Sequence, residues 1–191
     1  GQSTVGGPYV AAQNIAINVG SGTQTQSEAG YPQLTFLSTS DVTKTGAGTV
    51  VFDATNTYTG TTFVQQGTLQ LATQTAANSS RFVPQAGGVL ALPGAFSLET
   101  TVEGLDPNAG GLTDVASGRM TVSRGLTAAS LVTALVAGRS GGSFSGTSGI
   151  TSSTAAAEIA QGTPRSVGWL DNGDGSLTFA YAAAGDVDLS G

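Results

Sequence analysis

The sequence contains no cysteine and no histidine. Without thiols the chain cannot form a disulfide bond or a zinc–thiolate site. Without imidazoles it lacks the side chain that most often serves as a general acid or base near neutral pH. Zinc, thiolate and imidazole chemistry are therefore excluded as the basis of a function.

Charged side chains are scarce, at 9% of residues, and the net charge is −6. The six basic residues are scattered singly, whereas a nucleic-acid-binding surface needs a basic face. No apolar run approaches the roughly 20 residues of a membrane-spanning helix. We therefore expect no nucleic-acid partner and no transmembrane segment. Because the chain begins at Gly1 with neither a methionine nor a signal-peptide pattern, we expect a segment of something longer.

Glycine is abundant, with 29 residues in 191, and 39% of residues are hydrophobic. The clearest pattern covers 43–71, where the short segments 49–52, 61–64 and 68–71 alternate like strands. The residues at the corners between them, where a tight bend or a positive φ is needed, are Gly46, Gly48, Asn56, Gly60 and Gly67. Such regular corners predict one coil of a β-solenoid, which must bury its inner face against stacked neighbours.

Further strand patterns flank this coil, and their spacing predicts about two or three additional coils. They cover 15–19, 34–37, 81–83, 88–92, 96–98, 100–102, 112–115 and 119–122. The predicted fold is all-β, a short parallel β-helix (β-solenoid) with one small helix and a C-terminal β-hairpin. We expect N-terminal strands and a β-arc in 1–42, solenoid coils in 43–125, a helix and a Gly/Ser-rich loop in 126–165, and the hairpin and tail in 166–191.

The helix is expected after Thr127, an N-cap residue, and before Gly138, a stop signal. The apolar residues at helical spacing are Leu131, Val132, Leu135 and Val136. We expect their stripe to pack on the end of the solenoid as a cap. A helical turn is also expected over 154–161.

The hairpin is predicted from strand patterns over 166–170 and 177–181 around the turn signal at 171–175. Trp169 is the sole tryptophan. It is placed to pair across the strands with Phe179 or Tyr181.

The ordered residues of 43–71 resemble a known family, the autotransporter-associated β-strand repeat, also called the passenger-associated transport repeat. The resemblance is carried by Lys44, Gly46, Gly48, Thr49, Asn56, Tyr58, Gly60, Val64 and Gly67. Residues 87–191 resemble the C-terminal region of large secreted planctomycete proteins, through the segments 105–112, 137–139, 149–153, 167–169 and 171–175. In such proteins a dockerin-like segment follows, and 185–191 resemble its first half. The resemblance implies a parallel β-helix, an extracellular or cell-surface location and no catalytic residues.

Asp186, Asp188 and Ser190 occupy positions one, three and five of a partial calcium loop, with Gly191 at position six. The acidic ligand at position twelve is missing, so we expect calcium binding there to be weak and a frayed C-terminus to be the simpler interpretation. Residues 171–175 also resemble the opening of an Asp-rich loop, but a hairpin turn is the simpler explanation, because Asn-Gly and Asp-Gly supply the positive φ that it needs. No other cofactor is predicted.

Glu99, Glu103, Asp106 and Asp114 form the only acidic cluster, with Arg119 and Arg124 nearby. A polysaccharide lyase or hydrolase would need such carboxylates in a cleft with sugar-stacking aromatic residues. No aromatic platform lies near them in the sequence, so we interpret them as solvated faces.

The leading functional hypothesis is a non-enzymatic extracellular scaffold segment. Its partners would be neighbouring segments of a larger chain or further copies of itself, joined end to end into a fibre through exposed sheet edges. The alternative is an adhesin or glycan-binding module that uses the loops at 104–111 or 140–149. A third hypothesis is a β-helix lyase.

Overall fold

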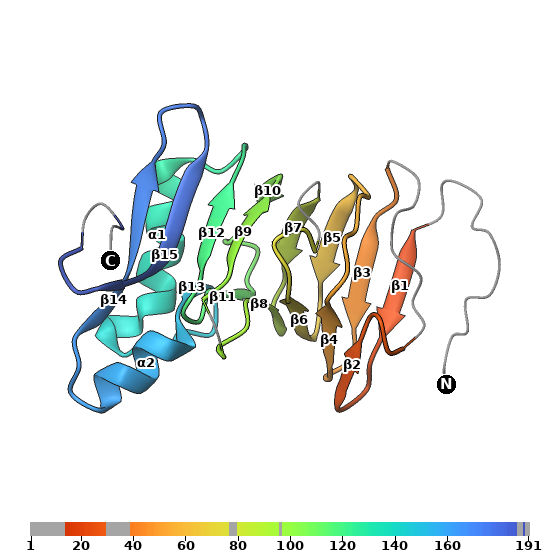
Figure 1. Cartoon of the computed structure of the whole chain (residues 1–191), viewed down its shortest axis with the longest axis horizontal. Helices are drawn as coiled ribbons and strands as arrows, with labels where there is room; N and C mark the ends of the chain where they lie inside the picture. The colour runs from red at the N-terminus through yellow and green to blue at the C-terminus, as the bar shows by residue number, and fades with distance from the viewer. Residues whose placement is uncertain (1–13, 30–38, 77–79, 96, 187–188, 190–191) are drawn as a thin grey trace.

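The computed structural model describes residues 14–29, 39–76, 80–95, 97–186 and 189 (Figure 1). The strands are β1 (Ile15–Asn18), β2 (Thr23–Thr25), β3 (Val42–Thr45), β4 (Thr49–Phe52), β5 (Thr61–Val64), β6 (Gly67–Leu71), β7 (Arg81–Pro84), β8 (Gly88–Ala91), β9 (Glu99–Val102), β10 (Gly104–Leu105), β11 (Leu112–Asp114), β12 (Arg119–Val122), β13 (Gly149–Thr151), β14 (Arg165–Asp171) and β15 (Leu177–Ala183). The helices are α1 (Ala128–Arg139) and α2 (Ser153–Ala160), with a short 3-10 turn at Ser140–Gly142.

Two parallel sheets form the walls of the solenoid. One has the strand order β1-β3-β5-β7-β10 and the other β13-β11-β8-β6-β4-β2, so successive strands alternate between the sheets. Val42 lies opposite Thr62, and Thr61 lies opposite Arg81. Equivalent positions therefore recur about every 20 residues, as expected for stacked coils. The predicted parallel β-solenoid is confirmed, with about four turns.

The third side of the solenoid consists of the segments that follow β2, β4, β6, β8 and β11 of the six-stranded sheet. In the first coils its described part contains no strand, whereas in the later coils it contains β9 and β12. The hairpin β14–β15 then joins β12 in antiparallel orientation, giving a sheet of order β14-β15-β12-β9. The predicted hairpin is confirmed, and Trp169 lies opposite Phe179 as expected.

The core lies between the three sides and is built by strand alternation. In β4, Val50 and Phe52 point inward and are buried, whereas Val51 between them is partly exposed. Leu69 and Leu71 of the next coil occupy the equivalent inner positions beside them. One continuous cluster of buried apolar side chains extends from the first coil to the hairpin. Each coil thus buries its inner face against its neighbours.

Glycines occupy the corner that leads into the second sheet. They are Gly48, Gly67, Gly88, Gly111 and Gly149, each at or just before the start of a strand. A Cβ at Gly48 would lie 2.7 Å from the carbonyl oxygen of Gly22 in the preceding coil. At Gly88 it would overlap the carbonyl of Val64. The corner glycines therefore permit the backbones of successive coils to approach closely.

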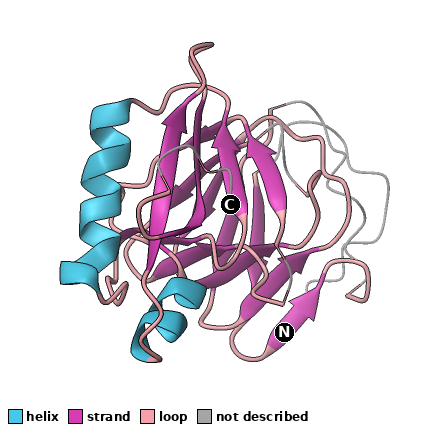
Figure 2. Ribbon diagram, turned by 60° about the vertical axis from the view of Figure 1, so that its left-hand side comes forward, coloured by secondary structure: helices cyan, strands magenta, loops and turns pink. Residues whose placement is uncertain are grey.

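Helix α1 covers the C-terminal end of the six-stranded sheet (Figures 1 and 2). Thr127 is its N-cap, as predicted, and accepts a hydrogen bond from the Ser130 amide. Gly138 lies within the helix instead of ending it. A Cβ at this glycine would overlap the carbonyl of Ile150 in β13. The helix backbone therefore packs directly against β13, and this close contact requires a glycine inside the helix.

The predicted apolar stripe of α1 is only partly the packing face. Leu131 and Ala134 are buried, whereas Val132 and Val136 are 41% and 68% exposed. The packing face is narrow because small residues bring the helix close to β13. None of the described helices combines the length and apolar character needed to span a bilayer.

Several sequence predictions need correction. The described residues form two helices instead of one, because Ser152 accepts a hydrogen bond from the Ala155 amide and caps a full helix, α2, where only a turn was expected. The repeat at 43–71 contributes four strands instead of three, since β3 precedes the others. Strands β2, β10 and β13 were not predicted. Residues 97 and 98 are not in a strand, and the predicted strand 34–37 lies outside the described residues.

Candidate functional site

Lys44 is the first notable residue of the repeat, because it points into the solenoid and is 1% exposed. Its Nζ donates hydrogen bonds to three carbonyl oxygens, those of Thr45 at 3.0 Å, Gly46 at 2.7 Å and Gln66 at 2.8 Å. Burial lowers the pKa of this ammonium group. The three bonds tie the corner of one coil to the corner of the next, so Lys44 acts as a structural cross-link.

Asn56 is fully buried and joins three successive coils on the third side. Its Oδ1 accepts from Gln26 Nε2 at 2.7 Å, and its Nδ2 donates to Gln26 Oε1 at 3.1 Å and to the Ala76 carbonyl at 2.6 Å. Gln26 is also buried. The two amides therefore satisfy each other in a place that water does not reach.

Tyr58 begins a chain of buried hydroxyl groups. Its Oη lies 2.5 Å from Thr62 Oγ1, which lies 2.9 Å from Ser80 Oγ. Ser80 donates to the Gly60 carbonyl at 2.7 Å. This last bond sets the direction of the chain, so Thr62 donates to Ser80 and Tyr58 donates to Thr62. Burial raises the pKa of Tyr58 to about 12.

We expect the solenoid to lose stability between about pH 10 and pH 12 because of Tyr58. The phenol ionises near pH 10 in the unfolded chain but only at about 12 in the folded one. The neutral phenol therefore makes its full contribution to the free energy of unfolding below pH 10. About 2 to 3 kcal/mol of that contribution is lost as pH rises from about 10 to about 12. Urea unfolding of the wild type and of Tyr58→Phe at a series of pH values measures the difference. Both proteins contain Lys44, so its titration affects them equally. The prediction is contradicted if the free energy of unfolding changes with pH in the same way in both.

The predicted corner residues of the repeat are packed against neighbouring coils. Gly46 has φ +78° and Gly67 has φ +67°, values that favour glycine. A Cβ at Gly60 would overlap the carbonyl of Ser40 in the preceding coil. Together with Gly48, Asn56 and Tyr58, these residues hold coils together and do not form a surface site.

The partial calcium loop remains a prediction, because Asp188 and Ser190 lie outside the described residues. The Asp186 amide donates to the Ala183 carbonyl at 3.1 Å. Leu189 is buried against Ala180 and Ala182 of β15, so at this residue the tail is packed on the hairpin. Nowhere in the described ranges do three acidic side chains gather in a way that could hold a metal ion.

The turn at 171–175 uses its carboxylates for its own backbone. Asp171 accepts a hydrogen bond from the Gly173 amide at 2.9 Å. Asp174 accepts from the amide of Ser176 at 2.9 Å and from its hydroxyl group at 2.6 Å. These bonds lower the pKa of Asp174. The hairpin interpretation therefore accounts for both aspartates.

The acidic residues considered for catalysis are directed to separate partners. Glu99 lies 3.8 Å from Arg119, and Asp106 lies 3.8 Å from Arg81. Glu103 pairs with Arg124. In addition, Asp114 accepts hydrogen bonds from the backbone amides at positions 116 and 153. The structure thus distributes these carboxylates between ion pairs and loop caps.

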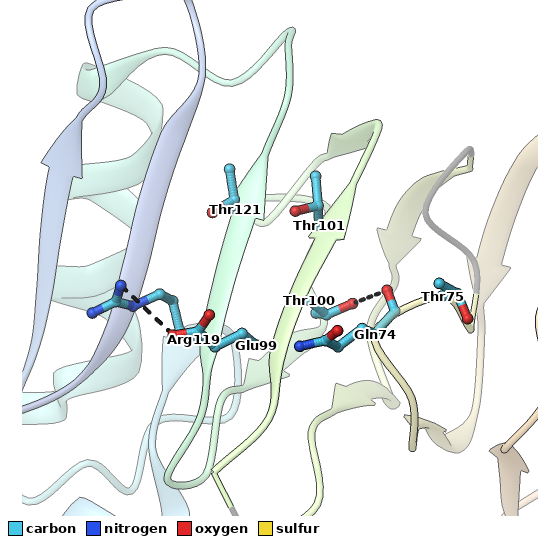
Figure 3. A pocket seen from close by; sticks show the side chains of 7 residues that line it. All are labelled: Gln74, Thr75, Glu99, Thr100, Thr101, Arg119 and Thr121. Atoms are coloured by element: carbon cyan, nitrogen blue, oxygen red, sulfur yellow. Dashed lines mark hydrogen bonds and ion pairs between the residues drawn. The ribbon is translucent and has the colours of Figure 1, made fainter.

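A polar depression of about 330 Å³ lies on the third side of the solenoid (Figure 3). Its lining comes from three successive coils: Gln74 and Thr75 from one, 99–101 of β9 from the next, and Arg119 and Thr121 of β12 from the last. Sequence reasoning singled out two of the lining residues, Glu99 and Arg119, but not the depression, because only the strand register brings the three segments together. A further signal was the repeated threonine in 100–101 and 121.

The fold and these contacts define a parallel β-solenoid whose coils are joined by buried polar side chains. Residues 42–71 match the family model of the passenger-associated-transport-repeat. No curated protein and no solved structure matches the chain significantly. The repeat occurs in autotransporter passengers, so its presence in a solenoid suggests a passenger segment and implies secretion or a cell-surface location.

Proposed function

We propose that the chain is a non-enzymatic scaffold segment of an autotransporter passenger or a related surface protein. The observation that carries this proposal is the buried cross-linking of successive coils by Lys44, Asn56 and Tyr58. These are the chemically most distinctive side chains of the repeat, and their polar groups bond to the protein's own coils. The resemblance of 87–191 to secreted planctomycete proteins supports the same location and stays a prediction.

End-to-end assembly is a second part of the proposal. Within the described part of the chain, no strand pairs with the outer edges of β1, β2, β10 or β14. At the C-terminal end of the six-stranded sheet, α1 packs against β13. A head-to-tail contact would therefore use the edge of β10, β14 or the helix surface at this end, and repetition of such a heterologous contact produces an open filament.

The scaffold role is tested by limited proteolysis with proteinase K. We expect a resistant core that keeps residues 42–71 together with α1, because the continuous apolar core and the cross-links resist local opening. Early cleavage within 42–71, at the rate seen for the urea-unfolded chain, would contradict the scaffold role.

Assembly is tested separately by negative-stain electron microscopy and sedimentation over a range of concentrations. Filaments that lengthen with concentration are the expected result. Dispersed single particles at every concentration would refute end-to-end assembly and leave the proteolysis result to decide the scaffold role.

A further inference from the structure

The polar depression on the third side begins at an open edge of β9. The Arg119 amide donates to the Leu98 carbonyl and the Ser123 amide to the Val102 carbonyl, so alternate residues of β9 direct their backbone groups to β12. The backbone groups of Glu99 and Thr101 accordingly face away from β12. No strand in the described ranges pairs with that side of β9. The edge therefore offers backbone donors and acceptors to the depression.

The preceding coil faces this edge without extending the sheet. Two hydrogen bonds join the coils here: Thr100 Oγ1 donates to the Gln74 carbonyl at 3.3 Å (Figure 3), and the Glu103 amide donates to the Ser80 carbonyl at 3.1 Å. Because these bonds already connect the two coils, we place a ligand on the outer face, where it would contact side chains, and not between the coils as an added strand.

The side chains over the edge are polar and together carry little net charge. Arg119 lies 3.8 Å from Glu99 and is also fixed by a hydrogen bond from its Nη2 to the Leu189 carbonyl at 2.6 Å. Threonine hydroxyl groups and the Gln74 amide supply further donors and acceptors. A ligand whose groups both donate and accept, without a charge of its own, matches this lining.

The hydroxyl groups also continue beyond the depression along the solenoid axis. Thr101 and Thr121 lie directly opposite each other on β9 and β12, at the strand spacing of about 4.8 Å. The row ends there, because Thr178 of β15, which is bonded to Thr121 at 2.8 Å, is buried and also accepts a hydrogen bond from Asn172 Nδ2. On the other side, Thr75 is bonded to Thr55 at 2.8 Å. A linear ligand with repeated hydroxyl groups would therefore find contacts over several coils.

We propose that the threonine-lined depression at the open edge of β9 binds a linear, neutral oligosaccharide. Its volume is at the small end of ligand sites, enough for a short part of the glycan, with the rest lying along the threonine row. None of the lining residues is aromatic, so the ring stacking that strengthens sugar binding is missing. The expected Kd is on the order of 1 mM, typical of a contact that gains strength through multiple copies.

The test is an NMR titration of the full chain with cellohexaose, maltohexaose and mannohexaose, with hexagalacturonate as an anionic comparison. At least one neutral probe should shift the amide signals of 74–75, 99–101 and 119–121. The double variant Thr101→Val/Thr121→Val should weaken that binding at least tenfold. This binding proposal does not depend on end-to-end assembly. If the spectrum shows a folded protein but no probe binds, the binding proposal fails while the scaffold proposal stands.

The matched control is Thr49→Val/Thr68→Val. These two threonines are also directly opposite each other and face outward, but from the second sheet. The control should bind like the wild type. The proposal is overturned if no neutral probe shifts these signals, if the control weakens binding equally, or if hexagalacturonate binds more tightly than every neutral probe.

Discussion

Replacing Asn56 with alanine is expected to lower the free energy of unfolding by about 3 to 5 kcal/mol. The change removes the buried amide that bonds to Gln26 and to the Ala76 carbonyl. Gln26 is 1% exposed, so its amide would lose its partner where water cannot replace it. Each buried polar group left unpaired costs about 1 to 3 kcal/mol. Urea unfolding followed by circular dichroism measures the change.

The neighbouring residue supplies a control for this prediction. Thr55 bonds to Thr75 at 2.8 Å between the coil of Asn56 and that of Ala76, but on the exposed surface. Thr55→Ala should therefore cost no more than about 0.5 kcal/mol. If the alanine variants at 55 and 56 are equally stable, the buried amide pair does not hold the coils together.

A double variant separates the loss of the bond from the cost of the orphaned partner. Gln26→Met combined with Asn56→Leu removes both amides and keeps apolar volume at each position. It should be more stable than Asn56→Leu alone, because the unpaired Gln26 amide is gone. A double variant that is less stable than either single variant would contradict this account.

Gly67→Ala is expected to destabilise the chain by about 3 to 5 kcal/mol or to prevent folding altogether. The new Cβ would overlap the carbonyl oxygens of Gly46 and Gly48 in the preceding coil. Backbone atoms cannot give way as a flexible side chain can, so the coils would have to separate. The positive φ of +67° adds to the cost. Soluble yield and the urea unfolding midpoint are the measurements.

Gly22→Ala is the matched control, since Gly22 has nearly the same φ, +72°, but no atom within 4 Å of the added Cβ. It should cost about 1 kcal/mol, the backbone strain alone. The difference between the two variants isolates the close approach of the coils. If both cost the same, the corner glycines are needed for their φ and not for stacking.

The coils with regular alternation could be predicted from the sequence, whereas the ends could not. Residues 49–52 alternate inward and outward as their side chains suggest. Strand β3 escaped prediction because it carries Lys44 on its inner face, where sequence patterns place apolar residues. Its burial depends on two carbonyl groups of the same corner, those of Thr45 and Gly46, and on the carbonyl of Gln66, which arrives only when the next coil stacks.

Similar reasons apply to the cap and to the polar depression. Strand β13 is separated from β11 by β12 and α1, so no regular repeat spacing indicates that Leu112 and Gly149 are partners. The exposure of Val136 follows from the narrow contact at Gly138, which helical periodicity does not reveal. The depression unites residues from three coils. Its position depends on the register of β9 with β12, which is a tertiary property.

The corner glycines have a consequence for how such a protein changes length in evolution. Gly67 meets the coil before it, and Gly88 does the same one coil later. The packing of each of these corners therefore depends on the adjacent coil and not on the helical cap. An insertion of a whole coil, about 20 residues with its own corner glycine, preserves every such fit. An insertion of half that length moves side chains out of line with the coils on both sides. The solenoid should therefore tolerate the insertion of complete coils better than insertions of other lengths.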